Sequence, residues 1–363
     1  MLDLAIEKDI KKATTLPGAF YNDQAAFEEV REKIFVKTWQ YIGDVQNTVR
    51  LNESTYPFTL LDGYLNEPLL LTRNKKGEVN CMSNVCTHRG NIVINNPGPA
   101  KGLMCGYHGR RWELDGSFKN MPEFKEAENF PRACDGLTKV PLKNWASQFL
   151  FASIDPLFDF TEVLNEMEDR VGFLPLDQFK FDANRSKDYL VNANWALYCD
   201  NYLEGFHIPF VHPDLNEALD YKNYRTVVGK HWNLQVGAGS PGTDCFNLPE
   251  NHKDYGQEIA AYYYWIFPNM MFNFYPWGLS INIVRPLAKD LSKVSFLTYI
   301  YDESKLERGA GALLDKVERE DEFVVEGVQK GIQSRLYQNG RFSPTREQGV
   351  HHFHGLLSEY LNK

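Results

Sequence analysis

Two short segments of the chain each combine a cysteine with a histidine. They read Cys86-Thr-His88 and Cys105-Gly-Tyr-His108, and sixteen residues separate them. Thiolate sulfur and imidazole nitrogen are both ligands for iron, and one kind of iron–sulfur cluster uses two of each. The spacing predicts that Cys86 and Cys105 hold one iron of such a cluster through sulfur. His88 and His108 are then expected to hold the second iron through nitrogen.

A zinc site is the alternative for these four residues. Structural zinc sites usually contain a Cys-x2–4-Cys pair followed by a His-x3–5-His pair, whereas each pair here is mixed. Gly90, Gly106 and Gly109 flank the two segments, which suits a close approach of backbone N–H groups to bridging sulfides. The pattern favours a Rieske [2Fe-2S] cluster, which accepts one electron and passes it on.

A second group of polar residues is a candidate acceptor for that electron. It lies in Asp200–His212, which reads Asp-Asn-Tyr-Leu-Glu-Gly-Phe-His-Ile-Pro-Phe-Val-His. On a continuous helix Asp200, Glu204 and His207 share one face, and Pro209 is expected to end the helix and let His212 turn back. Two histidines and a carboxylate form a known iron(II) site. The alternative, ordinary core histidines, is disfavoured here because an electron carrier needs an acceptor.

The third ligand of this iron is predicted from the last long helix. Its expected apolar face consists of Val317, Val324, Val328 and Ile332. Asp321 falls on that face, whereas Glu320 and Glu322 are expected to point elsewhere. A carboxylate facing the core is costly unless it is neutralised or bound to a metal. Asp321 is therefore the predicted ligand, and the alternative is an ion pair with a cation such as Arg335.

Composition restricts the class of protein. A length of 363 residues exceeds that of most single domains, so two domains are expected. The net charge of −9 argues against a nucleic-acid partner. There is no run of eighteen apolar residues and no apparent signal peptide, and the six cysteines are scattered without the pattern of a disulfide framework. We expect a cytoplasmic protein without a membrane segment.

The pattern along the chain divides it into three segments. Residues 1–39 contain a predicted helix that is capped by Asn22 or Asp23 and ends near Trp39. Residues 40–155 show short alternating runs and turns, which indicate an all-β domain that contains both Cys/His segments. Residues 156–363 contain a predicted helix at 162–171, strands at 262–267, 279–284 and 294–301, and a closing helix at about 310–337.

These motifs together resemble the α-subunit of the Rieske non-haem iron oxygenases. The resemblance rests on the two Cys/His segments, Asn194-Trp195, Glu204-x2-His207-x4-His212 and the late carboxylate. Within the family, the chain most resembles the choline monooxygenase and glycine-betaine or carnitine oxygenase branch. The segments that carry this finer resemblance are Ile266–Met271, Tyr275–Gly278, Glu320-Asp321, Glu326–Gly331 and His351–His354.

The resemblance implies a fold and an assembly. The fold is of the α+β class, with an all-β Rieske domain inserted in a helix-grip (START-like) catalytic domain, and the subunits usually form a homotrimer. The electron would cross from His108 of one subunit to His207 of its neighbour through Glu204. Asp200 and Asn201 are candidates for a supporting role around the catalytic iron, with surface positions as the alternative.

The resemblance also implies an activity. A separate NAD(P)H-dependent reductase, acting directly or through a ferredoxin, would supply electrons, and dioxygen would hydroxylate a small organic substrate by monooxygenation or dioxygenation. The aromatic stretch from Tyr262 to Trp277 suits a quaternary ammonium substrate, which opens N-demethylation as one outcome. The same rings also suit an aromatic substrate or plain core packing. An electron-transfer or ligand-binding protein with an inactive catalytic domain is the non-enzymatic alternative.

Two positions depart from the family pattern. The second loop usually reads His-Gly-Trp, but Arg110 follows Gly109 here and the aromatic residue arrives at Trp112. This departure raises the question of how the cluster is packed and where the reductase docks. The residue that links the two iron sites is usually aspartate, and its counterpart here is Glu204. A glutamate at this position also occurs in the betaine and carnitine branch.

Overall fold

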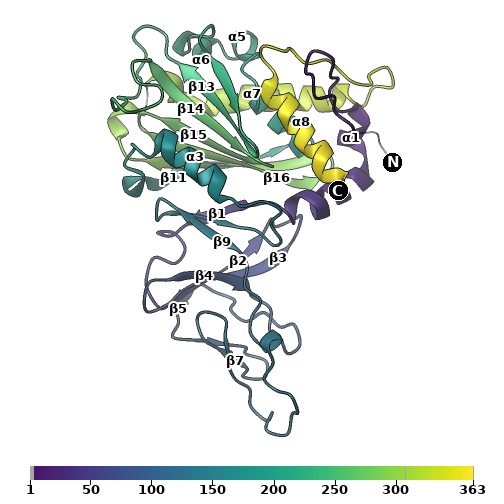
Figure 1. The fold of residues 1–363 in the computed structure, drawn as a ribbon, viewed down its shortest axis with the longest axis vertical. Coiled ribbons are helices and arrows are strands. Elements are labelled where there is room, and N and C mark those ends of the chain that lie inside the picture. The colour runs from purple at the N-terminus through teal and green to yellow at the C-terminus, as the bar shows by residue number, and fades with distance from the viewer. Residues whose placement is uncertain (1–3, 307, 363) are drawn as a thin grey trace. The chain divides into compact units, whose positions relative to one another are not determined.

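A computed structural model describes residues 4–306 and 308–362 of the chain. These residues form two compact units, labelled by element in Figure 1. The large unit consists of the residues up to Phe35 and those from Asp159 onward, and the inserted unit spans Val36–Phe158. The chain therefore leaves the large unit early, builds the inserted unit, and then returns.

The inserted unit is built from small antiparallel sheets. One sheet has the order β4 (Val79–Ser83), β3 (Glu67–Arg73), β2 (Ser54–Leu60) and β5 (Gly98–Pro99). A second has the order β1 (Gln40–Asp44), β10 (Phe149–Ala152) and β9 (Leu142–Trp145). The third has the order β6 (Leu103–Met104), β7 (Arg111–Trp112) and β8 (Phe118–Asn120). This unit is all-β apart from a short 3-10 turn at Ala133–Asp135.

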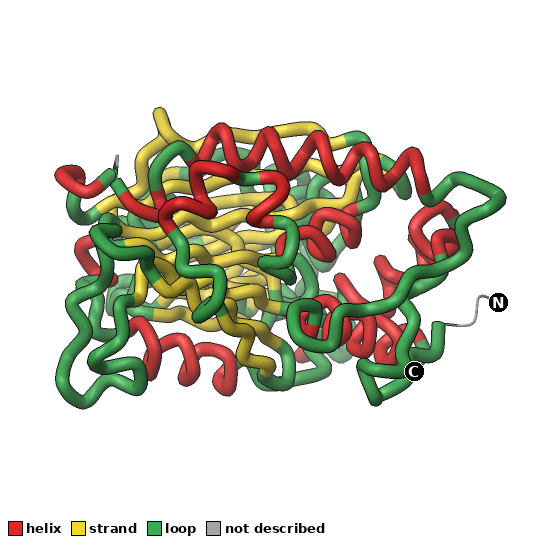
Figure 2. The backbone as a smooth tube through the Cα atoms, turned by 90° about the horizontal axis from the view of Figure 1, so that it is seen from above, coloured by secondary structure: helices red, strands yellow, loops and turns green. Residues whose placement is uncertain are grey.

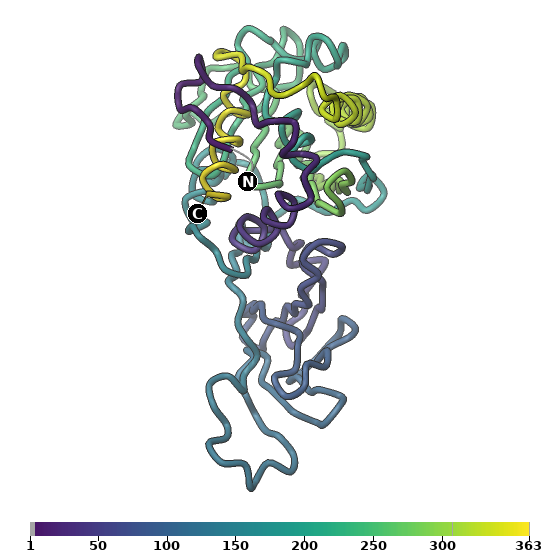
Figure 3. The backbone as a smooth tube through the Cα atoms, turned by 90° about the vertical axis from the view of Figure 1, so that its right-hand side faces the viewer, coloured from purple at the N-terminus to yellow at the C-terminus, as the bar shows by residue number. Residues whose placement is uncertain are grey.

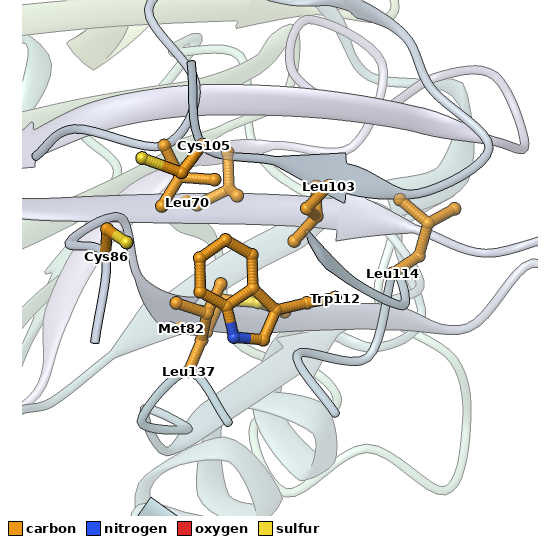
Figure 4. Close-up of a cluster of buried hydrophobic side chains, with 9 residues drawn as sticks. Leu70, Met82, Cys86, Leu103, Cys105, Trp112, Leu114 and Leu137 are labelled. Carbon is orange, nitrogen blue, oxygen red and sulfur yellow. The ribbon is translucent and has the colours of Figure 1, made fainter. Parts of the chain in front are cut away.

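The core of the inserted unit contains both cysteines of the Cys/His segments. Cys86 and Cys105 are buried among apolar side chains, with the fully buried Trp112 beside them (Figure 4). Cys86 follows β4, and Cys105 lies in the turn between β6 and β7. The sheets therefore bring the two segments together at one place in this core.

The large unit is organised around a seven-stranded antiparallel sheet. Its order is β11 (Lys180–Val191), β17 (Leu291–Ile300), β16 (Gly278–Ala288), β15 (Met270–Tyr275), β14 (Ile259–Ile266), β13 (Trp232–Ala238) and β12 (Arg225–Val228). Every residue of β14 and β15 is buried, so both faces of the central strands are covered. Figure 2 shows helices on both sides of this layer of strands.

Alternation along β14 sends its tyrosines to opposite faces of the sheet. Tyr262 and Tyr264 point to one face, where the Tyr264 hydroxyl donates to the carbonyl of Glu166 (3.4 Å) in α3 (Thr161–Val171). Tyr263 points to the other face and packs edge-on against Tyr275 of β15, with ring centroids 5.9 Å apart. The second face is the one on which the polar residues predicted to bind iron gather.

Several helices cover this second face and its end. They are α4 (Trp195–Tyr202), α5 (Ile208–Val211), α6 (Pro213–Ala218), α7 (Leu314–Gly331) and α8 (Gln348–Leu361). The N-terminal segment, with α1 (Gly18–Asn22) and α2 (Gln24–Val30), lies beside α8 in Figures 1 and 3. The backbone N–H of Leu16 donates to His354 of α8 (3.1 Å), so the two ends of the chain are tied to each other.

The helices predicted near the N-terminus and near the C-terminus exist, but the residues at which they end differ from the prediction. Asp23 caps α2 by accepting a hydrogen bond from the N–H of Ala26 (2.7 Å), but the helical stretch ends with a π-turn at Arg31–Phe35 rather than near Trp39. The predicted closing helix is shorter, ending at Gly331, and a further helix, α8, follows it. No helix in the described part of the chain has the length and apolar character needed to cross a lipid bilayer.

Candidate active site

The site is assembled on α4, whose start is fixed by Asn194. The Asn194 side chain accepts from the N–H of Ala196 (3.0 Å), which caps the helix, and donates to the carbonyl of Lys289 (2.8 Å) at the end of β16. Its backbone N–H donates to the Gln329 side chain of α7 (2.8 Å). One residue therefore holds α4, the sheet and α7 in a common position.

The chain leaves the helix before the first predicted ligand. α4 ends at Tyr202, and Glu204 accepts from the backbone N–H groups of Phe206 and His207 (the latter at 3.1 Å), which closes a tight turn. The prediction of a continuous helical face through Glu204 and His207 is therefore wrong. Pro209 lies in the first turn of α5, where its missing N–H costs nothing, so it helps to start a helix rather than to end one.

Three side chains converge at the end of this turn. His207 lies just before α5, His212 lies between α5 and α6, and Asp321 lies in the middle of α7. The Nε2 atom of His212 is 3.0 Å from an Asp321 carboxylate oxygen, and the Nε2 atom of His207 is 3.6 Å from the same oxygen. One ligand atom from each of the three residues lies within 4.8 Å of the others.

Both histidines are oriented from behind by a carboxylate. The Nδ1 atom of His207 is 2.7 Å from Glu204, and the Nδ1 atom of His212 is 2.7 Å from Glu320. Asn201 in turn donates to the Asp321 carboxylate (2.6 Å). Because each Nδ1 is occupied, each Nε2 lone pair is directed toward the common centre, which is the arrangement found around protein-bound metals. These residues fit an iron(II) ion.

The position of Asp321 was predicted from a helix face that the structure corrects. Val328 is 43% exposed, and the residues of α7 that are buried against the unit include Val325 and Gln329 instead. Glu320 does not point away, since it contacts His212. Glu320 is not identifiable from the sequence, because four carboxylates occupy positions 318 to 322 and helical phase alone does not rank them.

Asp200 lies near this centre but has other partners. Its carboxylate accepts from the Tyr21 hydroxyl (2.7 Å) and lies 2.9 Å from Nε2 of His354. His354 also accepts from the N–H of Leu16 through Nδ1, so Nε2 carries the proton. Asp200 therefore joins α4 to α8 and to the N-terminal segment, in contrast to Asn201, which contacts Asp321 directly.

Electrostatics within the site follow from burial and from the carboxylates. His212 is only 1% exposed, which opposes protonation, but hydrogen bonds to Asp321 and Glu320 raise the pKa of His212 above its ordinary value. Burial raises the pKa of Glu318 to about 8, and the nearby Asp321 carboxylate adds to this shift. A metal ion at the centre would supply the positive charge that these acidic groups lack.

A cavity of about 80 Å³ opens beside the three converging side chains. Its walls are rich in tyrosine, and the residues that line it include Tyr198, Tyr202, Tyr224, Tyr263, Tyr275, Leu314 and Glu318. Tyr263 and Tyr275, from the predicted aromatic stretch, face this cavity, whereas Tyr262 and Tyr264 do not. Because side chains alternate along a strand, one part of the aromatic stretch lines the cavity and the other part packs in the core.

The two Cys/His loops of the inserted unit have the same backbone design. The carbonyl of Cys86 accepts from the N–H of Gly90 (2.9 Å), and the carbonyl of Cys105 accepts from the N–H of Gly109 (3.0 Å). Both glycines have φ of +72°, a left-handed conformation that other residues rarely adopt. The N–H of Cys105 donates to the carbonyl of Arg110 (2.9 Å), as that of Cys86 does to Asn91 (2.8 Å).

The four side chains of these loops suit an iron–sulfur cluster. The rings of His88 and His108 lie 4.8 Å apart, and the amide of Asn91 donates to the Cys105 sulfur (3.5 Å). Burial opposes ionisation of Cys105, but backbone N–H groups of the loop, such as that of Tyr107, and the Asn91 amide lower the pKa of this thiol below its ordinary value. N–H groups aimed at sulfur are what a bound cluster requires. The pairs therefore fit a Rieske cluster.

Arg110 is buried rather than displayed at the surface. It is only 2% exposed and forms an ion pair with Asp135 (2.6 Å), while its guanidinium carbon lies 5.1 Å from the ring centre of Phe118. The Asp135 carbonyl also accepts from the Trp112 indole (3.0 Å) and from the Thr87 hydroxyl (2.9 Å). Asp135 thus connects both ligand loops, and Arg110 is part of the packing beneath them.

Two known protein families match different parts of the chain. Residues 41–131 match the Rieske [2Fe-2S] domain, and residues 176–363 match the catalytic domain of the ring-hydroxylating α-subunit. The second match alone covers more than half of the chain. A Rieske cluster and a mononuclear iron are the cofactors of this family.

Individual relatives point to one branch of the family. Choline monooxygenase of Beta vulgaris is 30% identical over 96% of this chain and 77% of its own length. The oxygenase subunit of carnitine monooxygenase from Escherichia coli is 27% identical over 96% of this chain and 94% of its own. A solved quaternary ammonium Rieske monooxygenase has the same fold, with a TM-score of 0.75 at 22% identity, over 98% of this chain and 100% of that one. The chain belongs to the Rieske non-haem iron oxygenases as an α-subunit, and it is an oxygenase rather than a separate electron carrier.

Proposed function

We propose that this chain is the oxygenase component of a monooxygenase that hydroxylates a C–H bond of a quaternary ammonium compound. One oxygen atom of dioxygen enters the substrate, and the other leaves as water after uptake of two electrons and two protons. The observation that carries the proposal is the position of His207, His212 and Asp321 on the wall of a tyrosine-rich cavity. The similarity to choline and carnitine monooxygenases supports it.

His207, His212 and Asp321 would hold the mononuclear iron, which supplies the site where dioxygen is activated. Glu204 and Glu320 keep the Nε2 atoms of the two histidines directed inward. Three protein ligands leave positions open for small molecules. The protein's own contribution is to fix the ligands and to present the substrate from the cavity.

Cys86 and Cys105 would hold one iron of the Rieske cluster, and His88 and His108 the other, so that single electrons can be passed onward. In this assignment residues 40–155 form the Rieske domain. Residues 1–39 and 156–363 then form the helix-grip catalytic domain, which the antiparallel sheet and the long α7 beside it support.

Tyrosines in the cavity would favour a cationic substrate. The rings of Tyr224 and Tyr263 lie 6.4 Å apart and those of Tyr263 and Tyr275 lie 5.9 Å apart, so they form one continuous surface. A quaternary ammonium group cannot donate a hydrogen bond, and the faces of aromatic rings are its usual partners in proteins. An arene substrate would gain only stacking from the same surface.

A homotrimer with electron transfer between subunits accounts for the surroundings of Glu204. Inter-subunit electron transfer is named for the solved quaternary ammonium monooxygenase. Phe206 and Phe210 flank His207 and are exposed, Phe210 by 80%. Apolar rings at such exposure are typical of surfaces that a second protein covers. We infer that a neighbouring subunit covers them, and that Glu204 links His207 to His108 of the partner subunit.

The electrons would come from a separate reductase, since the family's oxygenase subunits work with one. We propose an NAD(P)H-dependent reductase that acts directly or through a ferredoxin. We also propose a cytoplasmic location, because the four cysteines outside the Cys/His pairs form no disulfide in the described residues.

Substrate-dependent dioxygen uptake tests this proposal. The iron-loaded protein is mixed with NADH, a reductase and one candidate at a time: choline, glycine betaine, carnitine or naphthalene. We expect dioxygen uptake matched by a hydroxylated or demethylated ammonium product in mass spectra. Turnover of naphthalene alone would replace the proposal with arene hydroxylation.

The matched control is Asp321→Ala. This variant is expected to keep the cluster's visible spectrum, to contain two irons per chain rather than three, and to form no product. Product formation by the variant would show that another site carries out the chemistry.

A further inference from the structure

Glu318 occupies a position between two cavities of the large unit. It lies on α7 one turn before Asp321 and lines the cavity beside the three converging side chains. It also lines, together with Leu314, a larger cavity of about 340 Å³. The Glu318 carboxylate accepts from the Tyr198 hydroxyl (2.8 Å) and from the Asn282 amide (3.3 Å), which hold it in place.

This carboxylate has no cationic partner among the described residues. The basic residues that line the larger cavity are already paired, Arg185 with Asp182 (2.6 Å) and Lys187 with Asp315 (2.5 Å). The carboxylates that line the smaller cavity beside Glu318 are Glu204 and Asp321, and both of them contact histidine. Glu318 is therefore a buried acid without a cation beside it among the described residues, and burial, with the nearby Asp321 carboxylate, raises the pKa of its carboxyl to about 8.

An aromatic surface runs past Glu318 from one cavity to the other. Tyr263 and Tyr275 line the smaller cavity, and Trp277 lines the larger one. Tyr275 and Trp277 are stacked, with ring centroids 5.2 Å apart and an interplanar angle of 15°. Gly311 makes this possible, because any side chain at that position would overlap the Trp277 indole.

We propose that Glu318 is the counter-ion of the substrate's cationic nitrogen. The ammonium group lies between the Glu318 carboxylate and the rings of Tyr275 and Trp277, and this placement directs one end of the substrate toward His207, His212 and Asp321. The inference rests on the proposed function, in that the substrate is a quaternary ammonium compound. It adds the residue that selects for charge and that sets the orientation of the substrate.

Charge recognition is separable from a structural role of Glu318. A structural residue affects charged and neutral ligands alike, whereas a counter-ion affects only the charged one. Choline has a neutral isostere, 3,3-dimethyl-1-butanol, in which carbon replaces nitrogen. The ratio of the two affinities therefore reports the electrostatic contribution of Glu318 and cancels changes in cavity shape.

The experiment measures both affinities by calorimetry, without dioxygen, for the iron-loaded protein and for Glu318→Gln. We expect the wild-type protein to prefer choline, and Glu318→Gln to lower the affinity for choline by about tenfold or more while leaving that for the isostere unchanged. Glu326→Gln is the matched control, since Glu326 lies on the same helix, bonds to Asn192 and does not line either cavity. It is expected to change neither affinity.

Each other outcome has a distinct meaning. If the wild-type protein binds choline no better than the isostere, the substrate class under the proposed function is wrong. If it prefers choline and Glu318→Gln keeps that preference, the role of Glu318 is overturned while the function stands. If Glu318→Gln fails to fold, a crystal structure of the wild-type protein with choline decides. The nitrogen lies against the Glu318 carboxylate if the inference holds, and elsewhere if it does not.

Discussion

At the scale of residues, a glutamate carboxylate contacts the Nδ1 atom of each histidine in the site, but the two glutamates have different surroundings. Glu204 contacts Nδ1 of His207 and also closes the turn that leads to the exposed Phe206 and Phe210. Glu320 contacts Nδ1 of His212, a buried ring, from inside the same subunit. The same chemical group therefore supports both histidines, and Glu204 in addition shapes the turn whose exposed phenylalanines we propose that a partner subunit covers.

We expect Glu204→Gln to keep both metal sites occupied at saturating iron and to slow turnover strongly. The amide can still accept from the backbone N–H groups of the turn, but it does not carry the charge that favours transfer toward His207. Iron content and single-turnover cluster oxidation measure the effect. We expect full occupancy with cluster oxidation slowed by about 100-fold, the upper end of the range for loss of a carboxylate that orients a metal-binding histidine. Unchanged cluster oxidation would show that Glu204 is no part of the electron route.

The matched variant is Glu320→Gln. It is expected to weaken iron binding about 10- to 100-fold, because His212 loses its orienting carboxylate, yet to preserve the turnover rate per bound iron. If Glu320→Gln instead slowed cluster oxidation as much as Glu204→Gln, the distinction between the two carboxylates would be wrong.

Residue spacing and helical phase predicted which side chains the structure brings together, and the resemblance added Glu204 and Asn201, which contact His207 and Asp321. The Cys/His pairs and the two histidines are identifiable because few other arrangements use those residue types at such separations. Asp321 was predicted because it falls on a face of α7 that was expected to be apolar and buried. That face is partly exposed, so the residue is right although the argument for it is not. Glu318 and Glu320 were missed because their roles depend on Tyr198 and His212, which reach α7 from distant parts of the chain.

At the scale of elements, α8 supports the turn that bears Glu204. Gly349, in the first turn of α8, lies against the carbonyl of Leu203, so closely that a Cβ atom there would overlap it. His354 of the same helix contacts Asp200 of α4 (2.9 Å). The prediction of a single closing helix overlooked this element, although Val350, Phe353, Leu357 and Leu361 recur at helical spacing.

A pair of glycine substitutions tests this support. Gly349→Ala is expected to push α8 away from Leu203, to lower the unfolding temperature, and to reduce iron retention at His207. Gly355→Ala, on the same helix with open space around it, is expected to raise stability by up to about 1 kcal/mol through helix propensity. Thermal unfolding and iron content are the measurements. Iron retention equal in the two variants would show that the turn does not depend on α8.

At the scale of the whole molecule, the chain places its two candidate cofactor sites in separate compact units. The four Cys/His residues belong to the inserted unit, and His207, His212 and Asp321 belong to the large unit. The division into an all-β part and a mixed part was predictable from the change in pattern near Gln40. The order of strands in the large sheet was not, because β11 pairs with β17 across more than a hundred residues.

Mixed assemblies test whether electrons cross between subunits. Cys86→Ser removes the cluster from one subunit type, and Asp321→Ala removes the mononuclear iron from the other. Each variant alone is expected to be inactive, and co-expression of the two, separated by different tags, is expected to restore turnover. Transfer within a subunit predicts that the mixture stays inactive. Iron content confirms that each variant has lost only its own site.

The burial of Cys86 and Cys105 has a consequence for how the protein is made. Both sulfurs belong to the apolar core of the inserted unit, around Trp112. The cluster that they are proposed to hold would therefore be part of that core. A newly synthesised chain is therefore expected to gain stability when the cell's iron–sulfur delivery system loads the cluster. Expression that outpaces this delivery will accumulate chains that are open to proteolysis, and the supply of clusters will set the yield of enzyme.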